Sequence, residues 1–392
     1  MKEWKTYKIG DICKTNISQY SVKEGWDEFL YLDTGNITRN TIDDIVRYSS
    51  AAELPSRARR KVICDDIIFS TVRPNQCHFG ILSNPPANLL VSTGFTVITA
   101  KKEIVDPYYL YYYLTQESIV DYLHSIGEQA VSAYPSIKAQ DIEDLEIELP
   151  DLSTQNNIAK TLRALDEKIQ LNRQINDNLE QQAQNIFNHY FIESQTELGP
   201  YSEGFLTDIA VYLNGLAMQK FRPEGSDSGL PVLKIKELGQ RTCDNNSDRC
   251  SSVIKDEYIV NDGDVIFSWS GTLLVDLWCG GKCGLNQHLF KVTSDSYPTW
   301  FYYFWTKHHL DNFIRVAKDK AVTMGHIKRT ELEKANVIIP SQEKLSEIDK
   351  ILSPIIDGII THRVEMRRLA QLRDSLLPEL MSGELNINEI DC

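Results

Sequence analysis

The sequence predicts an α+β protein that contains two copies of one module, each a mixed α/β domain followed by a long helix. Two observations carry this prediction. Short motifs recur in the same order in both halves of the 392-residue chain, and each half ends in a long stretch with heptad spacing. The length agrees, because domains of roughly 100–200 residues would give two or three domains with cores of their own.

The internal repeat is the firmest feature of the sequence. Four motifs of the first half return in the second half at separations of 190 to 198 residues. The pairs are Asp66–Ser70 with Asp264–Ser268, the Pro-aromatic runs that begin at Pro107 and Pro298, Ala130–Ser132 with Ala321–Thr323, and Glu148–Pro150 with Ile338–Pro340. Chance does not account for four motifs in one order, so we predict a duplicated module.

Each copy begins with a globular part, residues 1–150 in the first copy and 199–340 in the second. Both are rich in short β-branched and aromatic runs separated by Gly, Asn, Asp and Pro, a pattern typical of strands and turns. The strands we expect are Val62–Ile63, Ile67–Val72, Phe95–Thr99, Val253–Val260 and Val265–Trp269. The aromatic runs at 108–114 and 300–305 are interpreted as short helices packed on a sheet.

Helices are predicted over 151–195 and 341–383, followed by a tail at 384–392. Apolar residues recur there at alternating spacings of four and three, the signature of a coiled coil. The seam residues are Ile158, Leu162, Leu165, Ile169, Asn172, Leu179, Ile348, Leu352, Ile355, Ile359, His362 and Leu369. Each helix would be about 50–60 Å long, and antiparallel pairing would create a pseudo-two-fold axis within one chain. Polar Asn172 and His362 would fix the register.

The composition is that of an ordinary globular protein, with 42% hydrophobic and 24% charged residues and a net charge of -14. It excludes collagen, a disordered tail and a small disulfide scaffold. The acidic total argues against a nucleic-acid partner, but much of the charge lies in Asp141–Glu148, away from the basic clusters. No signal-peptide core and no apolar run of membrane length is present. We therefore expect a cytoplasmic protein with reduced cysteines and no membrane partner.

No catalytic motif stands out in the chain. Asn84–Ala87 (NPPA) lacks the aromatic residue that an amino-methyltransferase stacks on a flipped base, and no phosphate-binding loop is present. Asp65, Asp66, Asp262 and Asp264 precede matching strands and are interpreted as turn residues. We therefore expect no catalytic residue and no cofactor bound by this chain.

Four cysteines of the second module leave a zinc site open. Cys243, Cys250, Cys279 and Cys283 lie within one stretch of the chain, but only the last two have the spacing usual for zinc ligands. The first module has no counterpart. Free buried thiols are the favoured interpretation, and a zinc site is the alternative.

Three features of the chain together resemble the specificity subunit of type I restriction–modification enzymes. They are the repeated Asp-Ile/Val-Ile-Phe-Ser motif, the Pro-aromatic helix, and the start of the first long helix, Pro150–Ile169 (PDLSTQNNIAKTLRALDEKI). The ending Leu380–Leu385 (LMSGEL) is also similar. The second long helix departs from the pattern, with Gln342 closer to the proline and Asp349 in place of Ala, which affects only its register.

The resemblance covers essentially the whole chain and implies a specific function. Such a subunit carries two target-recognition domains, each reading one half of a split site in double-stranded DNA, joined by the central and distal helices. The helices dock two methyltransferase subunits, to which two motor-nuclease subunits can attach. The specificity subunit performs no chemistry, so S-adenosylmethionine, ATP and Mg are expected on the partners.

Cations for phosphates and polar side chains for base edges are the residue types that DNA reading requires. We expect the basic run 57–61 to lie in a solvent-facing loop. We also hypothesise that Arg73 contacts a base or a phosphate. The candidate DNA-binding residues are Arg57, Arg59, Arg60, Lys61, Thr71, Arg73, Asn75, Gln76, Lys220, Arg222, Lys234, Lys236, Ser270, Thr272, Asn286, Gln287, His288, Lys318 and Lys320.

The alternative function is a coiled-coil adaptor whose duplicated modules bind proteins and never contact DNA. The salt dependence of binding distinguishes DNA recognition from the adaptor function, because phosphate contacts make affinity fall steeply as the salt concentration rises. The target bases, the gap between half-sites and the presence of a nuclease subunit are not encoded in any pattern that we can read.

Overall fold

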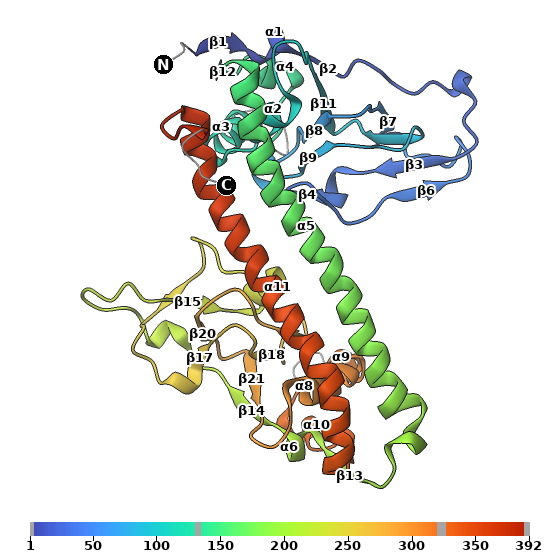
Figure 1. Cartoon of the computed structure of the whole chain (residues 1–392), viewed down its shortest axis with the longest axis vertical. Coiled ribbons are helices and arrows are strands. Elements are labelled where there is room, and N and C mark those ends of the chain that lie inside the picture. The colour runs from blue at the N-terminus through green and yellow to red at the C-terminus, as the bar shows by residue number, and fades with distance from the viewer. Residues whose placement is uncertain (1–3, 130–134, 320–326, 388–392) are drawn as a thin grey trace. The chain divides into compact units, whose positions relative to one another are not determined.

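The computed structural model describes residues 4–129, 135–319 and 327–387. Lys320 and the repeated motifs Ala130–Ser132 and Ala321–Thr323 lie outside the described residues. The chain divides into two compact units, unit 1 with residues 1–167 and 371–392 and unit 2 with residues 168–370. The two long helices, α5 (Leu152–Asn188) and α11 (Gln342–Ser382), each contribute residues to both units (Figure 1).

The globular part of unit 1, called domain 1, is built on two four-stranded sheets with strand orders β2-β11-β8-β9 and β6-β3-β10-β7. A two-stranded sheet pairs β1 with β12, and a small hairpin pairs β4 with β5. The strands are β1 (Lys5–Lys8), β2 (Cys13–Thr15), β3 (Phe29–Leu32), β4 (Ile37–Thr38), β5 (Thr41–Ile42), β6 (Val46–Tyr48), β7 (Ala58–Lys61), β8 (Asp66–Ser70), β9 (Phe79–Leu82), β10 (Leu89–Ser92), β11 (Phe95–Ala100) and β12 (Glu146–Leu149). The helices are α1 (Ile9–Ile12), α2 (Pro107–Leu114), α3 (Glu117–Glu128) and α4 (Ala139–Glu143).

The globular part of unit 2, called domain 2, repeats the three larger sheet arrangements, but helix α7 lies between β15 and β16, where domain 1 has the β4–β5 hairpin between β3 and β6. Its sheets have the orders β14-β21-β18-β19, β16-β15-β20-β17 and β13-β22. The strands are β13 (Tyr201–Phe205), β14 (Val211–Asn214), β15 (Leu230–Leu233), β16 (Arg249–Cys250), β17 (Ile259–Val260), β18 (Val265–Ser268), β19 (Leu274–Leu277), β20 (Cys283–Leu285), β21 (Leu289–Thr293) and β22 (Asn336–Pro340). The helices are α6 (Leu206–Ile209), α7 (Ile235–Gln240), α8 (Thr299–His308), α9 (Leu310–Asp319) and α10 (Arg329–Leu332). The duplicated α+β module is confirmed.

The aromatic runs form helices packed on a sheet, as predicted. α2 begins after Asp106, whose side chain accepts a hydrogen bond from the Tyr109 amide at 2.9 Å and so caps a free helical N–H. Pro107 occupies the first turn, where its missing N–H costs nothing. Most residues of α2 and α8 are buried, because these helices close the apolar cores of their domains.

Two predicted strands are wrong. Val62 and Ile63 follow the end of β7 and lead into a turn. In the segment Val253–Val260 only Ile259 and Val260 form a strand, while Val253 is 85% exposed. Both segments are rich in β-branched residues, but Val62, Ile63 and residues 253–258 are not part of any strand pairing, and β propensity depends on such a partner.

The two long helices pair antiparallel within each unit. In unit 1, Arg373 of α11 donates to Asp166 of α5 at 2.6 Å. In unit 2, Asn172 donates to Glu365 at 2.7 Å, and Asn176 Nδ2 donates to the carbonyl of Ile359 at 3.1 Å. Along these contacts the residue numbers on α11 decrease while those on α5 increase, so the two helices run in opposite directions.

The residues predicted for the helical seam divide into two groups. Those that are buried are Ile158, Leu162, Asn172, Ile348, Leu352 and Ile359, and those that are half-buried are Leu165, Ile169, Leu179, Ile355, His362 and Leu369. Polar His362 contacts Asn176, which follows the same heptad spacing, with its Nδ1 3.0 Å from the Asn176 Oδ1. No helix among the described residues is long and apolar enough to cross a membrane.

Candidate nucleic-acid interface

Domain 1 brings the predicted residues Arg57, Thr71 and Arg73 together with Thr93 and Gly94, which were not predicted, where strands of its two sheets begin and end; we call this place edge 1. The Thr93 amide donates to the Arg57 carbonyl at 2.9 Å, and both the amide and the hydroxyl of Thr71 donate to the Gly94 carbonyl at 2.8 Å. β8 and β10 end here, whereas β7 and β11 begin here. Residues more than twenty positions apart therefore become neighbours.

The loop after β8 holds its polar residues on a constrained backbone. Arg73 and Cys77 both have left-handed backbone angles, with φ of 48° and 57°, on either side of a 3₁₀ turn over Pro74–Gln76. Asn75 and Gln76 on this turn are exposed. Non-glycine residues in this conformation cost energy and gather at functional sites.

Arg39 is a cation of domain 1 that sequence reasoning missed. It lies at the tip of the β4–β5 hairpin with φ of 46°, its amide donates to the Cys77 carbonyl at 2.9 Å, and its side chain is exposed. The hairpin therefore places this guanidinium beside the Arg73–Cys77 loop. The near-palindrome Ile37-Thr-Arg-Asn-Thr-Ile42 around a turn dipeptide was a signal that could have revealed it.

The prediction that residues 57–61 form a solvent-facing loop is wrong, because residues 58–61 form strand β7. Lys61 pairs with Glu24 at 2.7 Å, and Arg59 donates to the carbonyl of Ser56. Arg60 is half-buried, and within the described part of the chain its Nε and Nη1 have no hydrogen-bond partner. Burial lowers the pKa of its guanidinium. Strand β7 therefore carries Lys61, which is paired with a carboxylate, and half-buried Arg60, two of whose nitrogens have no hydrogen-bond partner among the described residues.

Domain 2 brings four predicted residues into contact, which we call edge 2 (Ser270, Asn286, Gln287 and His288). Ser270 Oγ lies 3.0 Å from Nδ1 of His288, and Gln287 Nε2 lies 3.3 Å from its Nε2. The His288 amide donates to Asn286 Oδ1 at 3.2 Å. Trp269, which was not predicted, borders edge 2 and donates from Nε1 to Asn214 at 2.9 Å.

The two edges share a backbone scaffold and differ in side chains. In domain 1 the Thr71 amide binds the Gly94 carbonyl, and the Thr71 carbonyl accepts from Ile137 at 2.9 Å. In domain 2 Trp269 makes the same two contacts, with His288 and with Ile327. Equivalent backbone positions thus present Thr and Gly in one copy but Trp and His in the other.

Two of the remaining predicted cations, Lys234 and Lys236, lie close to carboxylates of domain 2. Lys234 pairs with Asp248, and Lys236 lies 4.0 Å from Asp244. The predicted residues that are exposed away from these contacts are Lys220, Arg222, Thr272 and Lys318. Lys320 lies outside the described residues.

The cysteines of domain 2 are free thiols, and those of Cys243 and Cys283 contact each other. Cys250, Cys279 and Cys283 are buried and Cys243 is half-buried. Burial raises the pKa of Cys279 to about 11. In the part of the chain that the structure describes, no three His, Cys, Asp or Glu side chains are grouped so that they could hold a metal ion.

A duplicated α+β domain on paired helices, with a different polar edge in each copy, defines a two-site recognition protein. A family model of the type I restriction modification DNA specificity domain matches residues 1–181 and 200–368. The chain belongs to this family.

Relatives of known name cover nearly the whole chain. It is 23% identical to the HindI specificity subunit of Haemophilus influenzae, a type I restriction enzyme, over 98% of this chain and 100% of the relative. It is 24% identical to the MjaIX specificity subunit of Methanocaldococcus jannaschii, over 99% of this chain and 95% of the relative. The type I restriction-modification S subunit from M. genitalium shares the fold, with a TM-score of 0.59 at 14% identity over 96% of both chains.

Proposed function

We propose that this chain is the DNA-recognition subunit of a type I restriction–modification complex, and that each domain reads one half of a split site. The observation that carries this proposal is the pair of edges with one backbone scaffold and different side chains. A conserved frame with exchanged side chains is what two readers of different half-sites require. The family match favours this function over a DNA-free adaptor, and the chain itself is not an enzyme.

The residues of the edges have the chemistry that base reading needs. Half-buried Gln287 carries an amide of the kind that pairs with adenine, whereas Asn286 is only 7% exposed and its Oδ1 accepts from the His288 amide. The guanidinium of Arg57 or Arg73 can pair with guanine. Thr71 offers a methyl group and a hydroxyl. Arg60 is half-buried, and since its Nε and Nη1 are buried, only its Nη2 is left to contact a phosphate.

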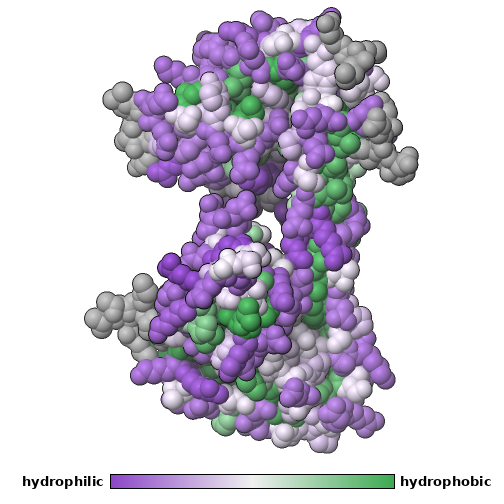
Figure 2. All heavy atoms as spheres, turned by 90° about the vertical axis from the view of Figure 1, so that its left-hand side faces the viewer, coloured by the Kyte–Doolittle hydropathy of each residue, from purple (hydrophilic) through white to green (hydrophobic). Residues whose placement is uncertain are grey.

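The partners are two methyltransferase subunits docked on α5 and α11, to which two motor-nuclease subunits can attach. S-adenosylmethionine, ATP and Mg belong to those partners, and the complex works in the cytoplasm. Apolar side chains on both helices support the docking, since Leu171 is 50%, Ile351 43% and Leu372 47% exposed. Figure 2 shows a largely hydrophilic face interrupted by apolar patches.

The net charge of -14 implies that the chain leaves part of the phosphate neutralisation to its partners. We therefore expect weak, salt-sensitive binding by the free chain and tight, specific binding by the assembled complex.

Methylome sequencing of cells that express the complex tests the proposal. It should reveal a split adenine motif with a fixed gap. Variants then assign the halves: Thr71→Val should change only the half read by domain 1, and His288→Gln only the half read by domain 2. An Arg73→Ala complex should lose affinity or site preference.

Three results would count against the proposal. The first is the absence of a split motif although the methyltransferase is expressed. The second is a single-edge variant that alters both halves equally. The third is affinity that does not respond to salt, which would favour the adaptor function. Lys5→Ala serves as the control for Thr71→Val, because Lys5 lies on β1 in the separate two-stranded sheet β1-β12.

A further inference from the structure

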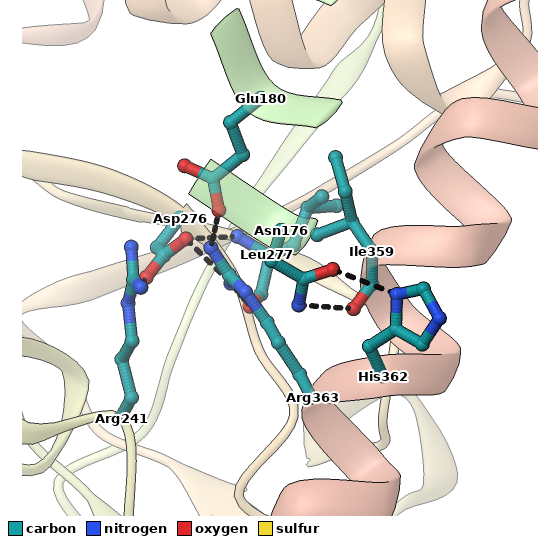
Figure 3. Close-up of polar contacts among 8 residues, drawn as sticks. All are labelled: Asn176, Glu180, Arg241, Asp276, Leu277, Ile359, His362 and Arg363. Atoms are coloured by element: carbon teal, nitrogen blue, oxygen red, sulfur yellow. Dashed lines mark hydrogen bonds and ion pairs between the residues drawn. The ribbon is translucent and has the colours of Figure 1, made fainter. Parts of the chain in front are cut away.

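A buried ionic network joins domain 2 to both long helices inside unit 2. Arg363 of α11 is 7% exposed, and Asp276 of β19 is 5% exposed. Arg363 Nη1 donates to Asp276 Oδ1 at 2.9 Å and to the Leu277 carbonyl at 2.8 Å. Its Nη2 donates to Glu180 of α5 at 2.6 Å. One guanidinium therefore holds two helices and one strand together (Figure 3).

The charges in this network balance. Arg241, at the C-terminal end of α7, donates from Nε to the second oxygen of Asp276 at 2.6 Å. Two arginines thus face the carboxylates of Asp276 and Glu180. Burial alone would lower the pKa of Arg363, but the two carboxylates raise it above its ordinary value, so the side chain remains charged.

A second arginine of α11 holds the same domain one helical turn further along. Both Nη atoms of Arg367 donate to Asp262, at 2.7 and 2.8 Å, and the side chain also reaches the carbonyl of Cys279. Residues four apart lie on one helix face. Domain 2 is therefore held at two points, and both sets of bonds are directional.

Such a network affects the orientation of the groups it joins more than it affects the free energy of unfolding. A buried ion pair can be replaced by apolar residues at little cost in stability. Apolar packing, however, is non-directional, whereas the guanidinium fork bonds in a fixed plane. The network thus adds a directional constraint on the orientation of domain 2 to the apolar packing that already joins the domain to α5 and α11.

Among the described residues of domain 1, the position that corresponds to Asp276 carries no carboxylate. The sheet registers pair Ile266 with Asp276 in domain 2 and Ile68 with Gly80 in domain 1, so a glycine occupies the position of the aspartate. Domain 1 meets α5 through another element, since Tyr112 of α2 donates to Asp166 at 2.6 Å.

We propose that Arg363 is a positioning residue that fixes the orientation of domain 2 on the two helices and thereby restricts the gap that the complex accepts between half-sites. This inference rests on the proposed function. Each added base pair moves a half-site by about 3.4 Å along the duplex and turns it by about 35°. A domain with a fixed orientation cannot follow both changes.

The test uses the chain assembled with its methyltransferase subunits and duplexes that carry the two methylome-defined half-sites with gaps one base pair shorter, equal and one longer. The wild-type complex should lose about tenfold or more in affinity when the gap changes by one. Arg363→Met combined with Asp276→Leu removes the two buried charges together. It should bind the natural gap within about threefold of wild type and discriminate between gaps by less than about threefold, with unchanged base preference in both half-sites.

Arg363→Lys keeps the charge but loses the fork, and it should broaden gap tolerance in the same direction even if the double variant does not fold. Lys168→Met is the control, because Lys168 pairs with Glu365 across the two helices, 3.8 Å away, without contacting domain 2. Wild-type gap selectivity in the folded double variant or in Arg363→Lys would overturn the inference, as would equal broadening by Lys168→Met. If the wild-type complex recognises no split site at all, the proposed function fails instead.

Discussion

Replacing Arg60 of domain 1 with methionine should stabilise the free chain and weaken its DNA binding. Arg60 lies on β7, opposite Val91 in the register, and its Nε and Nη1 are buried without a partner in the described residues. A buried polar group without a hydrogen bond costs roughly 1–3 kcal/mol. Methionine is shorter than arginine, but it keeps an unbranched stem that packs flexibly among apolar neighbours.

The expected gain in the free energy of unfolding is therefore about 1–3 kcal/mol, measured from urea unfolding of the free chain. If the guanidinium binds a phosphate, DNA affinity falls, and the slope of log K against log salt decreases by about 1. Fluorescence anisotropy over a range of salt concentrations measures both quantities on the assembled complex.

Arg47→Met on β6 is the matched control. This arginine is 68% exposed and lies 2.9 Å from exposed Glu28, so its removal should change stability by less than about 0.5 kcal/mol. It should also leave the salt slope unchanged. The reasoning about Arg60 fails if Arg60→Met destabilises the chain, or if affinity and salt slope both stay at their wild-type values.

Three further predictions concern stability. Arg373→Met should lower the free energy of unfolding by about 1–3 kcal/mol because it leaves the Asp166 carboxylate without its counter-charge, and Asp166→Asn in the same chain, which keeps an acceptor for the Tyr112 hydroxyl, should restore most of the loss in urea unfolding. Gly215→Ala should destabilise by about 1–3 kcal/mol in thermal unfolding, because its Cβ would lie 2.2 Å from the Asn286 carbonyl, whereas Gly35→Ala meets nothing within 4 Å and should be neutral. Burial raises the pKa of the Cys13 thiol from 9.0 to about 12, so between these pH values the unfolded chain ionises first and this thiol lowers stability by up to about 1.4 kcal/mol per pH unit; Cys13→Ala should remove that share of the pH dependence, while Cys279 and the other buried thiols keep theirs.

The sequence predicted the duplication and the helices well because both are local patterns. Asp66–Ser70 and Asp264–Ser268 recur as buried strands in matching positions of matching sheets. Heptad spacing is visible in one dimension, so Ile158 and Leu352 could be recognised as inward-facing residues. The strand predicted over Val253–Val260 was wrong for most of its length because only its last two residues have a neighbouring strand, β20, with which to pair.

The candidate edges could be predicted only as separate pieces. Thr71, Ser270 and His288 were recognised as polar residues near repeated strands. Strand pairings between distant segments bring His288 to Ser270. They likewise bring Arg57 to Thr71, through the Thr93–Gly94 turn. Sequence spacing carries no information about such pairings.

The amino-acid sequence alone sufficed to establish two recognition modules and two long helices, because repeats and heptads are properties of neighbouring residues. Which side chain of α11 is buried against domain 2 was settled by tertiary packing. The heptad assigned His362 to the seam, yet its neighbour Arg363 is the more buried, because β19 brings Asp276 to it from 87 residues away. A buried charge is tolerated only where the fold supplies its counter-charge, and that condition is met in three dimensions.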